Sequence, residues 1–307
     1  MIDGVGAGQS RVQAAATVSF LEGPACGPGG TIYFSDIPAN RIYALEPDGQ
    51  VRLYREPSGR ANGNVFDRDG RLVTCEGAEY GLGGGRRISR TDLVTGAVVV
   101  VTDRFEGARY NSPNDVTVDE QGQIFFTDPR FGRRHEMELT QEGVYRVDPD
   151  GRVRRILGQP AIQRPNGIAV SPDGATLYVA DSNYDPGGNR CLWAFPLSAA
   201  GDAGPGRLVF SWAPGRGADG IEVDVDGNIW AAAGISRSRS AGETDVHRPG
   251  VYVVHPGGRL LDMIPVPQDT VTNLCFGGPD LSTLFVTAGN TLFRLNAGVR
   301  GHHVYRP

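Results

Sequence analysis

Short apolar segments alternate with polar turns along this chain in a regular repeat. Six times, a polar amide or acid precedes a short apolar strand, a turn that is usually Asp-Gly, and a second apolar strand. The six segments begin at positions 22, 62, 114, 166, 219 and 273, with spacings of 40, 52, 52, 53 and 54 residues. Two further strands continue each unit, for example on either side of Asp48-Gly49 and of Asp150-Gly151. Alternating apolar residues around a two-residue Asp-Gly turn are typical of a β-hairpin.

This repeat predicts an all-β fold, a six-bladed β-propeller with four antiparallel strands in each blade. A stacked solenoid is the competing architecture, but neither end of the chain carries a capping repeat. The sixth unit lacks its outermost strand, whereas the segment Ala16–Leu21 precedes the first unit and has no blade of its own. We therefore expect the N-terminal strand to complete blade six and to close the ring. Residues 1–307 are then expected to form a single domain.

Composition narrows the classes of function. The 44 glycines and 21 prolines suit many short strands joined by tight turns. The net charge of -5 and the scattered basic residues argue against nucleic acid as a partner. We expect no membrane partner, because no apolar run is long enough to cross a bilayer. The four cysteines lie far apart and the N-terminus lacks a signal-peptide pattern, so reduced thiols in a cytoplasmic protein are expected. No feature predicts the oligomeric state.

The polar residues that open the six units are the main candidates for chemistry. In a propeller the innermost strand of each blade runs along the central channel, so equivalent residues meet at one mouth. These residues are Glu22, Asn62, Asn114, Asn166, Asp219 and Asn273. Two carboxylates and four amides suit a hard divalent cation, Ca²⁺ first, and the absence of histidine and cysteine argues against zinc. The alternative is ordinary turn chemistry of Asn and Asp, a role that Glu22 does not share.

A second set of carboxylates ends the second strand of four units, close to the same mouth. These are Asp36, Glu76, Asp128 and Asp181. Capping of the following loops is favoured for Asp36 and Asp181, and orientation of the metal-binding amides is the functional alternative. His135 and His247 lie in long rim loops, where a solvated loop residue is the more ordinary interpretation.

Several segments are long enough to carry a resemblance. EGPACGPGGTIYFSDIPANRIY, NSPNDV, RPNGIAVSPDGATLYVADS and ADGIEVDVDGNIW resemble the gluconolactonase and senescence-marker-protein family, whose distant relatives include calcium-dependent diisopropylfluorophosphatases. The similarity extends from about residue 18 to residue 296. It implies a six-bladed propeller that hydrolyses lactones and binds Ca²⁺, Zn²⁺, Mn²⁺ or Fe²⁺. It also implies metal ligands at Glu22, Asn166 and Asp219, with Asn114 either ligating or holding substrate. Where some animal members carry a sugar-contacting arginine, this chain has Ser112.

Together these patterns predict a metal-dependent hydrolase that opens a small, sugar-type lactone at the channel mouth. Asp219 is expected to act as a general base on water or, alternatively, as a nucleophile, with Asn114 assisting. The candidates for substrate contacts are Asn62, Glu76, Ser112 and Asn273. The alternative is a non-enzymatic propeller that binds a ligand or peptide and holds calcium as a structural ion.

Overall fold

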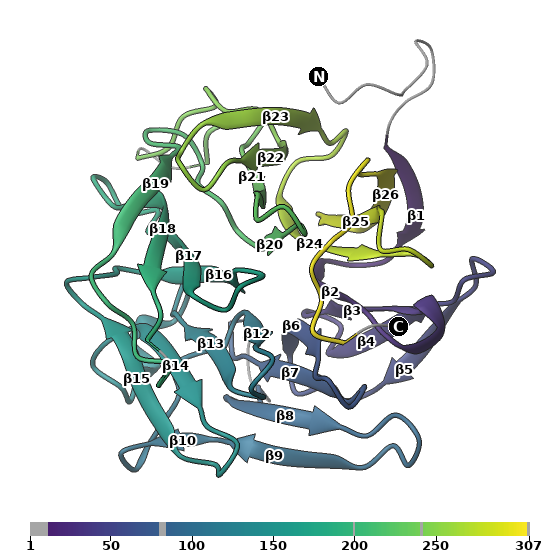
Figure 1. The fold of residues 1–307 in the computed structure, drawn as a ribbon, viewed down its shortest axis with the longest axis horizontal. Helices are drawn as coiled ribbons and strands as arrows, with labels where there is room; N and C mark the ends of the chain where they lie inside the picture. The colour runs from purple at the N-terminus through teal and green to yellow at the C-terminus, as the bar shows by residue number, and fades with distance from the viewer. Residues whose placement is uncertain (1–11, 80–83, 199, 240–241, 306–307) are drawn as a thin grey trace.

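Six four-stranded antiparallel sheets are arranged in a ring around a central axis (Figure 1). A computed structural model of the chain describes residues 12–79, 84–198, 200–239 and 242–305. Each sheet is built from strands that follow one another in the sequence, apart from the sheet that holds the first strand. The predicted all-β, six-bladed propeller is therefore confirmed.

The strands follow the predicted units. Blade one holds β2 (Leu21–Cys26), β3 (Ile32–Asp36), β4 (Arg41–Leu45) and β5 (Val51–Arg55). Blade two holds β6 (Ala61–Phe66), β7 (Leu72–Glu76), β8 (Arg87–Thr91) and β9 (Val98–Thr102). Blade three holds β12 (Val116–Val118), β13 (Ile124–Asp128), β14 (Gly143–Val147) and β15 (Val153–Gly158). Blade four holds β16 (Pro165–Val170), β17 (Thr176–Ser182), β18 (Arg190–Pro196) and β19 (Arg207–Ser211).

The last two blades complete the ring. Blade five holds β20 (Ile221–Val223), β21 (Ile229–Ala233), β22 (Gly250–Val254) and β23 (Leu260–Pro265). Blade six holds β24 (Val271–Gly277), β25 (Thr283–Ala288), β26 (Thr291–Asn296) and β1 (Gln13–Thr17). The short strands β10 (Arg104–Phe105) and β11 (Ala108–Arg109) form a separate hairpin. Two 3₁₀ turns, η1 (Pro28–Gly30) and η2 (Arg134–Glu136), lie in loops.

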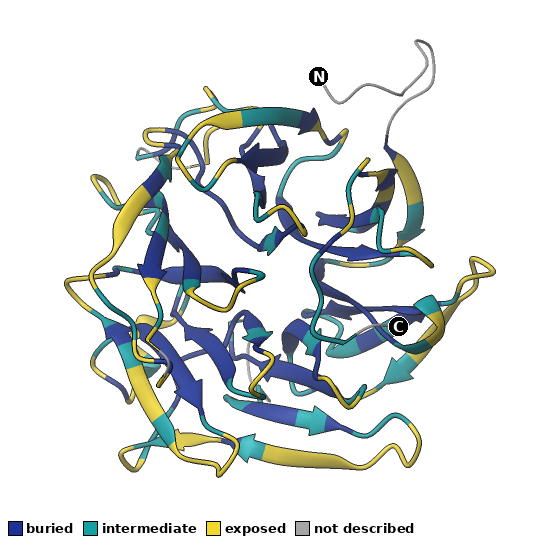
Figure 2. Cartoon of the chain, viewed as in Figure 1, coloured by how far each residue is buried: buried dark blue, intermediate teal, exposed yellow. Residues whose placement is uncertain are grey.

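Burial increases from the rim of each blade towards the axis (Figure 2). The inner strands β2 and β3 are buried along their whole length, whereas β5 is exposed over its first three residues. The Asp-Gly turns between outer strands place glycine at positive φ, 89° at Gly49 and 85° at Gly151. Asp48 Oδ1 accepts a hydrogen bond from the Gln50 N–H at 2.9 Å. These turns have the local chemistry expected of tight hairpins.

The N-terminal strand closes the ring, but its bounds differ from those predicted. β1 pairs antiparallel with β26, with Gln13 opposite Arg294 and Thr17 opposite Thr291. Leu21 belongs to β2, so the predicted segment Ala16–Leu21 spans a turn between two blades. The Asp36 carboxylate accepts a hydrogen bond from the Ser19 N–H at 3.0 Å and bends the chain there. The sequence alternation gives no sign of this turn.

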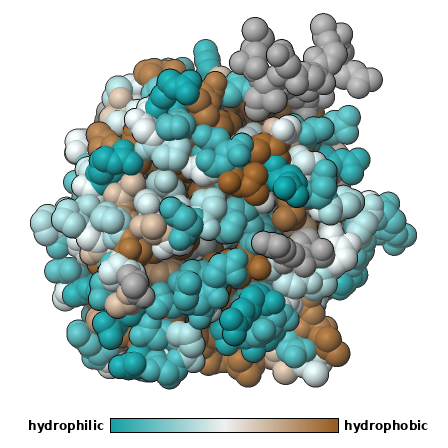
Figure 3. All heavy atoms as spheres, viewed as in Figure 1, coloured by the Kyte–Doolittle hydropathy of each residue, from teal (hydrophilic) through white to brown (hydrophobic). Residues whose placement is uncertain are grey.

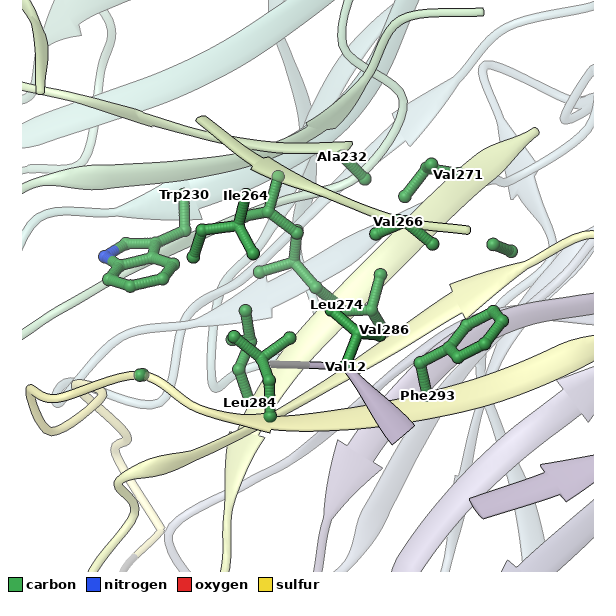
Figure 4. Packing of buried hydrophobic residues seen from close by; sticks show 14 of the residues in the cluster. Val12, Trp230, Ala232, Ile264, Val266, Val271, Leu274, Leu284, Val286 and Phe293 are labelled. Atoms are coloured by element: carbon green, nitrogen blue, oxygen red, sulfur yellow. The ribbon is translucent and has the colours of Figure 1, made fainter. Parts of the chain in front are cut away.

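Apolar side chains from blades five and six pack together at the closure (Figure 4). Trp230 is completely buried, and its indole N–H donates to Asp224 Oδ2 at 2.9 Å. Val286 and Leu284 come from blade six, and Val12, 7% exposed, joins the same cluster from just before β1. The closing strand therefore adds both a hydrogen-bonded ladder and apolar burial.

Deletion of residues 1–17 should destabilise the protein strongly, because it removes β1 and Val12 and exposes the edge of β26. We expect Tm to fall by at least about 5 °C, a loss of a few kcal/mol in a protein of this size. Deletion of residues 1–11 alone leaves Val12 and β1 in the chain and serves as the control. Equal melting temperatures of the 1–17 deletion and the full chain, measured by circular dichroism, would contradict the closure.

The face in Figure 3 is predominantly hydrophilic, with hydrophobic atoms scattered in small groups. Within the described part of the chain, no helix has the length and apolar character that a membrane crossing requires.

Candidate active site

Five of the six predicted residues meet in one pocket. Its volume is about 380 Å³, a size suited to a small organic ligand. The five that line it are Glu22, Asn62, Asn114, Asn166 and Asp219. Each lies at or near the start of the inner strand of its blade, so the rotational repeat of the fold places them around the same mouth.

Close backbone contacts between neighbouring blades fix these positions. The N–H groups of Gly63 and Gly167 donate to the carbonyl oxygens of Asn114 and Asp219, each at 2.7 Å. A Cβ atom on Gly167 would lie 2.4 Å from the Asp219 carbonyl oxygen. Only glycine permits this approach, which explains why a glycine so often follows the polar residue. The side chains at the mouth are therefore carried by a tightly hydrogen-bonded ring of backbone.

Asn273 does not line this pocket, because it lies one residue beyond the position that the other five residues occupy in their blades. Its N–H donates to the Thr287 hydroxyl, just as the Asp115 N–H donates to the Thr127 hydroxyl. Asn273 is thus the equivalent of Asp115, and Thr272 holds the position of Asp219 and Asn114. The Thr272 carbonyl accordingly accepts from the Gly220 N–H at 2.7 Å. Because Thr272 carries neither an amide nor an acid, the repeat of polar residues in the sequence indicated the neighbouring Asn273 instead.

Two buried carboxylates dominate the electrostatics of the pocket. Burial, together with the charges of Asp219 and Asp115, raises the pKa of Glu22 well above its ordinary value. Burial also raises the pKa of Asp219, and the Arg216 guanidinium opposes that shift. Asp219 is held on both oxygens, by Asn166 Nδ2 at 2.6 Å and by Arg216 Nη2 at 2.9 Å. Facing acids of this kind favour either a shared proton or a bound cation.

The donor set suits a hard cation. Glu22 and Asp219 supply carboxylate oxygens, and Asn114 and Asn166 supply amide oxygens. The side-chain oxygen of Asn62, a residue only 5% exposed, has no hydrogen-bond partner among the residues that the structure describes. Among the described residues, no three of His, Cys, Asp and Glu are grouped as they would be in a metal site built from these residues alone. A metal at this mouth would therefore depend on the amides as much as on the carboxylates.

Comparison with known proteins identifies the family of the chain. Residues 20–290 match the family model described as the SMP-30/Gluconolactonase/LRE-like region. The chain belongs to this family. Gluconolactonase from Zymomonas mobilis is 30% identical over 314 residues, which cover 94% of this chain and 81% of the relative. Pentonolactonase from Haloferax volcanii is 27% identical, with 93% of each chain covered.

Solved structures of the SMP-30/gluconolactonase family share the fold. A gluconolactonase from Xanthomonas campestris superposes with a TM-score of 0.78 at 32% identity, covering 93% of this chain and 89% of that one. A regucalcin from Agrobacterium tumefaciens gives a TM-score of 0.73 at 22% identity, covering 95% and 94%. The second likeness bears on the fold alone.

Four carboxylates were predicted at the ends of the second strands of the blades. In this family member, three of them bind backbone N–H groups of loops. Asp36, Asp128 and Asp181 accept hydrogen bonds from backbone N–H groups. Asp128 Oδ1 accepts from the Ser112 N–H at 2.7 Å, and the Ser112 hydroxyl accepts from the Ala78 N–H at 2.9 Å. These donors to the three carboxylates lie in the loops that lead into the inner strands, whereas capping of the following loops was expected. Among the described residues, the Ala39 N–H, which donates to Asp36 Oδ1 at 3.2 Å, is the backbone group of a following loop that is capped in this way. Ser112 is buried within the loop structure and does not line the described pocket.

Glu76 has a different environment from the other three. Its side chain is completely buried between Arg55 and Arg87, which donate to Oε1 and Oε2, each at 2.7 Å. This double ion pair uses both oxygens, and Glu76 does not line the described pocket. The structure therefore gives no support to Glu76, Ser112 or Asn273 as substrate contacts in this pocket. Arg87 comes from the neighbouring strand β8 of the same blade and Arg55 from β5 of blade one, so Glu76 forms ion pairs within its blade and across to the next one.

Sequence reasoning predicts that the long loops 77–87, 130–142, 183–190 and 234–248 form the rim and contact substrate, but it singles out none of the pocket-lining residues in them and misses Arg216. Phe131 and Tyr184 stack with ring centroids 5.8 Å apart, and Arg216 and Arg239 bring positive charge. Glu79 accepts hydrogen bonds from the backbone of the loop that carries Phe131. All five come from loops whose sequences differ from blade to blade, so no repeat could reveal them. Residues 80–83 and 240–241 of two predicted rim loops lie outside the described residues.

Neither rim histidine lines the described pocket. The side chain of His135 is 79% exposed beside Glu136, as a solvated loop residue would be. His247 packs edge-on against Tyr252, with ring centroids 6.1 Å apart, and burial lowers its pKa.

A larger surface hollow of about 970 Å³ lies between blades one and six. The carboxylate that lines it, Glu46, already accepts hydrogen bonds from Thr31 and Arg52. We therefore favour the smaller pocket, where several buried polar groups converge.

A further acid lies in the channel of this family member. Glu222 lines a cavity of about 50 Å³ with Asp115, Asn273 and His303. Burial, and secondarily the charge of Asp115, raise the pKa of Glu222 to about 8 from an ordinary 4.5. The native state thus keeps a proton that the unfolded chain loses. The free energy of unfolding should consequently fall as the pH rises from about 4.5 to about 8.

Glu222→Gln should remove this pH dependence, because glutamine does not titrate. We expect the variant to melt at least about 3 °C above wild type at pH 9 and close to wild type at pH 4.5. Glu120→Gln, at an exposed position, is the matched control. A Glu222→Gln variant with the same Tm difference from wild type at both pH values would disprove the assignment.

Proposed function

We propose that the protein is a metal-dependent lactonase that opens a small, sugar-type lactone in the pocket of Glu22, Asn62, Asn114, Asn166 and Asp219. The observation that carries this proposal is the convergence of two buried carboxylates and three amides in a pocket of about 380 Å³. The relatives named gluconolactonase and pentonolactonase support lactones as the substrate class.

Glu22, Asn114, Asn166 and Asp219 are the residues that would hold the metal. Their oxygen donors favour Ca²⁺, with Mn²⁺, Fe²⁺ and Zn²⁺ as the other candidates. When bound, such an ion supplies positive charge that polarises a carbonyl group and lowers the pKa of water.

The remaining chemistry belongs to the side chains. Asp219, oriented by Asn166 and Arg216, accepts a proton from a water molecule as the water oxygen attacks the lactone carbonyl carbon. The bond between that carbon and the ring oxygen then breaks, and the ring oxygen takes up the proton as a hydroxyl. The product is an open-chain hydroxy acid, which loses its carboxyl proton to solvent. Asn62 Oδ1 is available to accept a hydrogen bond from a substrate hydroxyl.

Ring opening measured with a panel of aldonolactones tests the proposal. A weakly buffered assay with a pH indicator measures the rate of ring opening in three samples. These are chelator-treated protein, the same protein reloaded with Ca²⁺, and a metal-free blank without protein. We expect turnover only in the reloaded sample. Metal binding without turnover of any lactone in the panel would contradict the proposal and favour a ligand-binding propeller.

A further inference from the structure

Arg216 is a buried cation at the centre of the candidate site. It lines the pocket, is only 8% exposed, and donates through Nη2 to Asp219 Oδ2 at 2.9 Å. Nη1 lies 4.0 Å from Glu243 Oε1. The guanidinium carbon stands 4.7 Å from the centre of the Tyr184 ring. Two acids and an aromatic face therefore hold this charge in place away from bulk water.

The Nε donor of this guanidinium is buried and available to a ligand. Nε and Nη2 point their hydrogens in the same direction, which is the geometry that binds two neighbouring oxygens. Asp219 occupies the Nη2 end of this pair, and within the described part of the chain the buried Arg216 Nε has no hydrogen-bond partner. A buried donor left unpaired is unfavourable, so a ligand oxygen beside Asp219 would be bound favourably there.

We propose that Arg216 is a further catalytic residue, whose guanidinium binds the acyl oxygen of the lactone as it becomes negatively charged. This inference rests on the proposed lactonase function. A water held by Asp219 attacks the acyl carbon, so the acyl oxygen lies within a few bond lengths of the Asp219 carboxylate. That oxygen gains charge in the tetrahedral intermediate and keeps it in the product carboxylate. A fixed cation in a desolvated site stabilises both species more than the neutral lactone.

The packing around Tyr184 offers a matched control. Arg190 lies on the same ring, with its guanidinium carbon 5.7 Å from the ring centre, and is only 2% exposed. It donates to the Gly242 carbonyl at 2.9 Å and does not line the described pocket. Removing Arg190 thus disturbs the support of Tyr184 without removing a cation from the site.

The test compares Arg216→Gln, Arg216→Lys and Arg190→Gln at equal bound-metal content. For Arg216→Gln we expect kcat to fall by at least about a hundredfold, as when an oxyanion donor is lost, with KM for a neutral lactone changed less than about threefold. The affinity for the open-chain hydroxy acid, measured by calorimetry, should fall at least about tenfold. Arg216→Lys should recover part of both losses, and Arg190→Gln should show neither.

Unchanged kcat and product affinity in Arg216→Gln would overturn the role of Arg216. Equal losses in Arg190→Gln would also overturn it, because they would trace the effect to the packing of Tyr184. If Arg216→Gln fails to fold, Arg216→Lys is the deciding variant, because lysine keeps the charge but lacks the paired donors. Wild-type affinity of Arg216→Lys for the hydroxy acid would contradict the proposal. Wild-type protein that opens no lactone would contradict the proposed function itself, which separates the two failures.

Discussion

Asp219→Asn should lower lactone turnover by at least about a hundredfold, the low end of the usual loss when a general base is removed. Asparagine preserves an oxygen of similar position but neither the charge nor the proton acceptor. The loss should persist when excess metal restores full occupancy, because the missing step is a proton transfer. Turnover and bound metal must therefore be measured on the same preparation.

Recovery of near wild-type turnover in metal-saturated Asp219→Asn would contradict a catalytic role. Asp219 would then be a ligand only. The hydrogen bonds from Asn166 and Arg216 provide a check on geometry, because the amide can accept only through its single oxygen. A crystal structure of the variant with the side chain in place would exclude misplacement as the cause of the loss.

Glu22→Gln should weaken metal binding by at least about tenfold, because it removes one of the two carboxylates that balance the cation. Glu22 is buried beside Asp219, and the pKa of its carboxyl is raised for that reason. A bound cation would reverse this penalty by stabilising the ionised form of both acids. Calorimetric titration of the metal-free variant with Ca²⁺ measures the effect.

Glu79→Gln is the control for this titration. Glu79 also lines the pocket, but its oxygens accept hydrogen bonds from the Phe131 and Gly132 N–H groups at 3.2 and 2.7 Å. Its removal changes the charge of the pocket without removing a proposed ligand. Equal Ca²⁺ affinities of wild type and Glu22→Gln, or equal losses in Glu22→Gln and Glu79→Gln, would refute the ligand assignment.

The repeat was sufficient to predict the fold and the five polar residues that meet in the pocket. A polar residue followed by an inner strand recurs because every blade packs against its neighbours in the same way. The same logic failed at Thr272, since a threonine occupies the repeated position and the polar Asn273 follows it. It also failed at Glu76, which stands where Asp128 does but pairs with Arg55 and Arg87.

The pocket walls could not be predicted from the repeat. Phe131, Tyr184 and Arg216 lie in loops that differ in length and sequence between blades, and only the ring brings those loops together. A lone arginine before a Gly-Ala-Asp-Gly segment has no distinctive signal in the sequence. The role of Arg216 can be inferred only from the structure, in which its guanidinium donates to Asp219 and lies over the Tyr184 ring.

A single titration tests the central claim most directly. Ca²⁺ is added in steps to metal-free protein, and at each step both the bound metal and the rate of aldonolactone opening are measured. The account predicts that the rate rises in proportion to bound metal and reaches a plateau at about one ion per chain, as a single site at the channel mouth requires. Full turnover in the metal-free protein, or a rate that does not follow the bound metal, would contradict it.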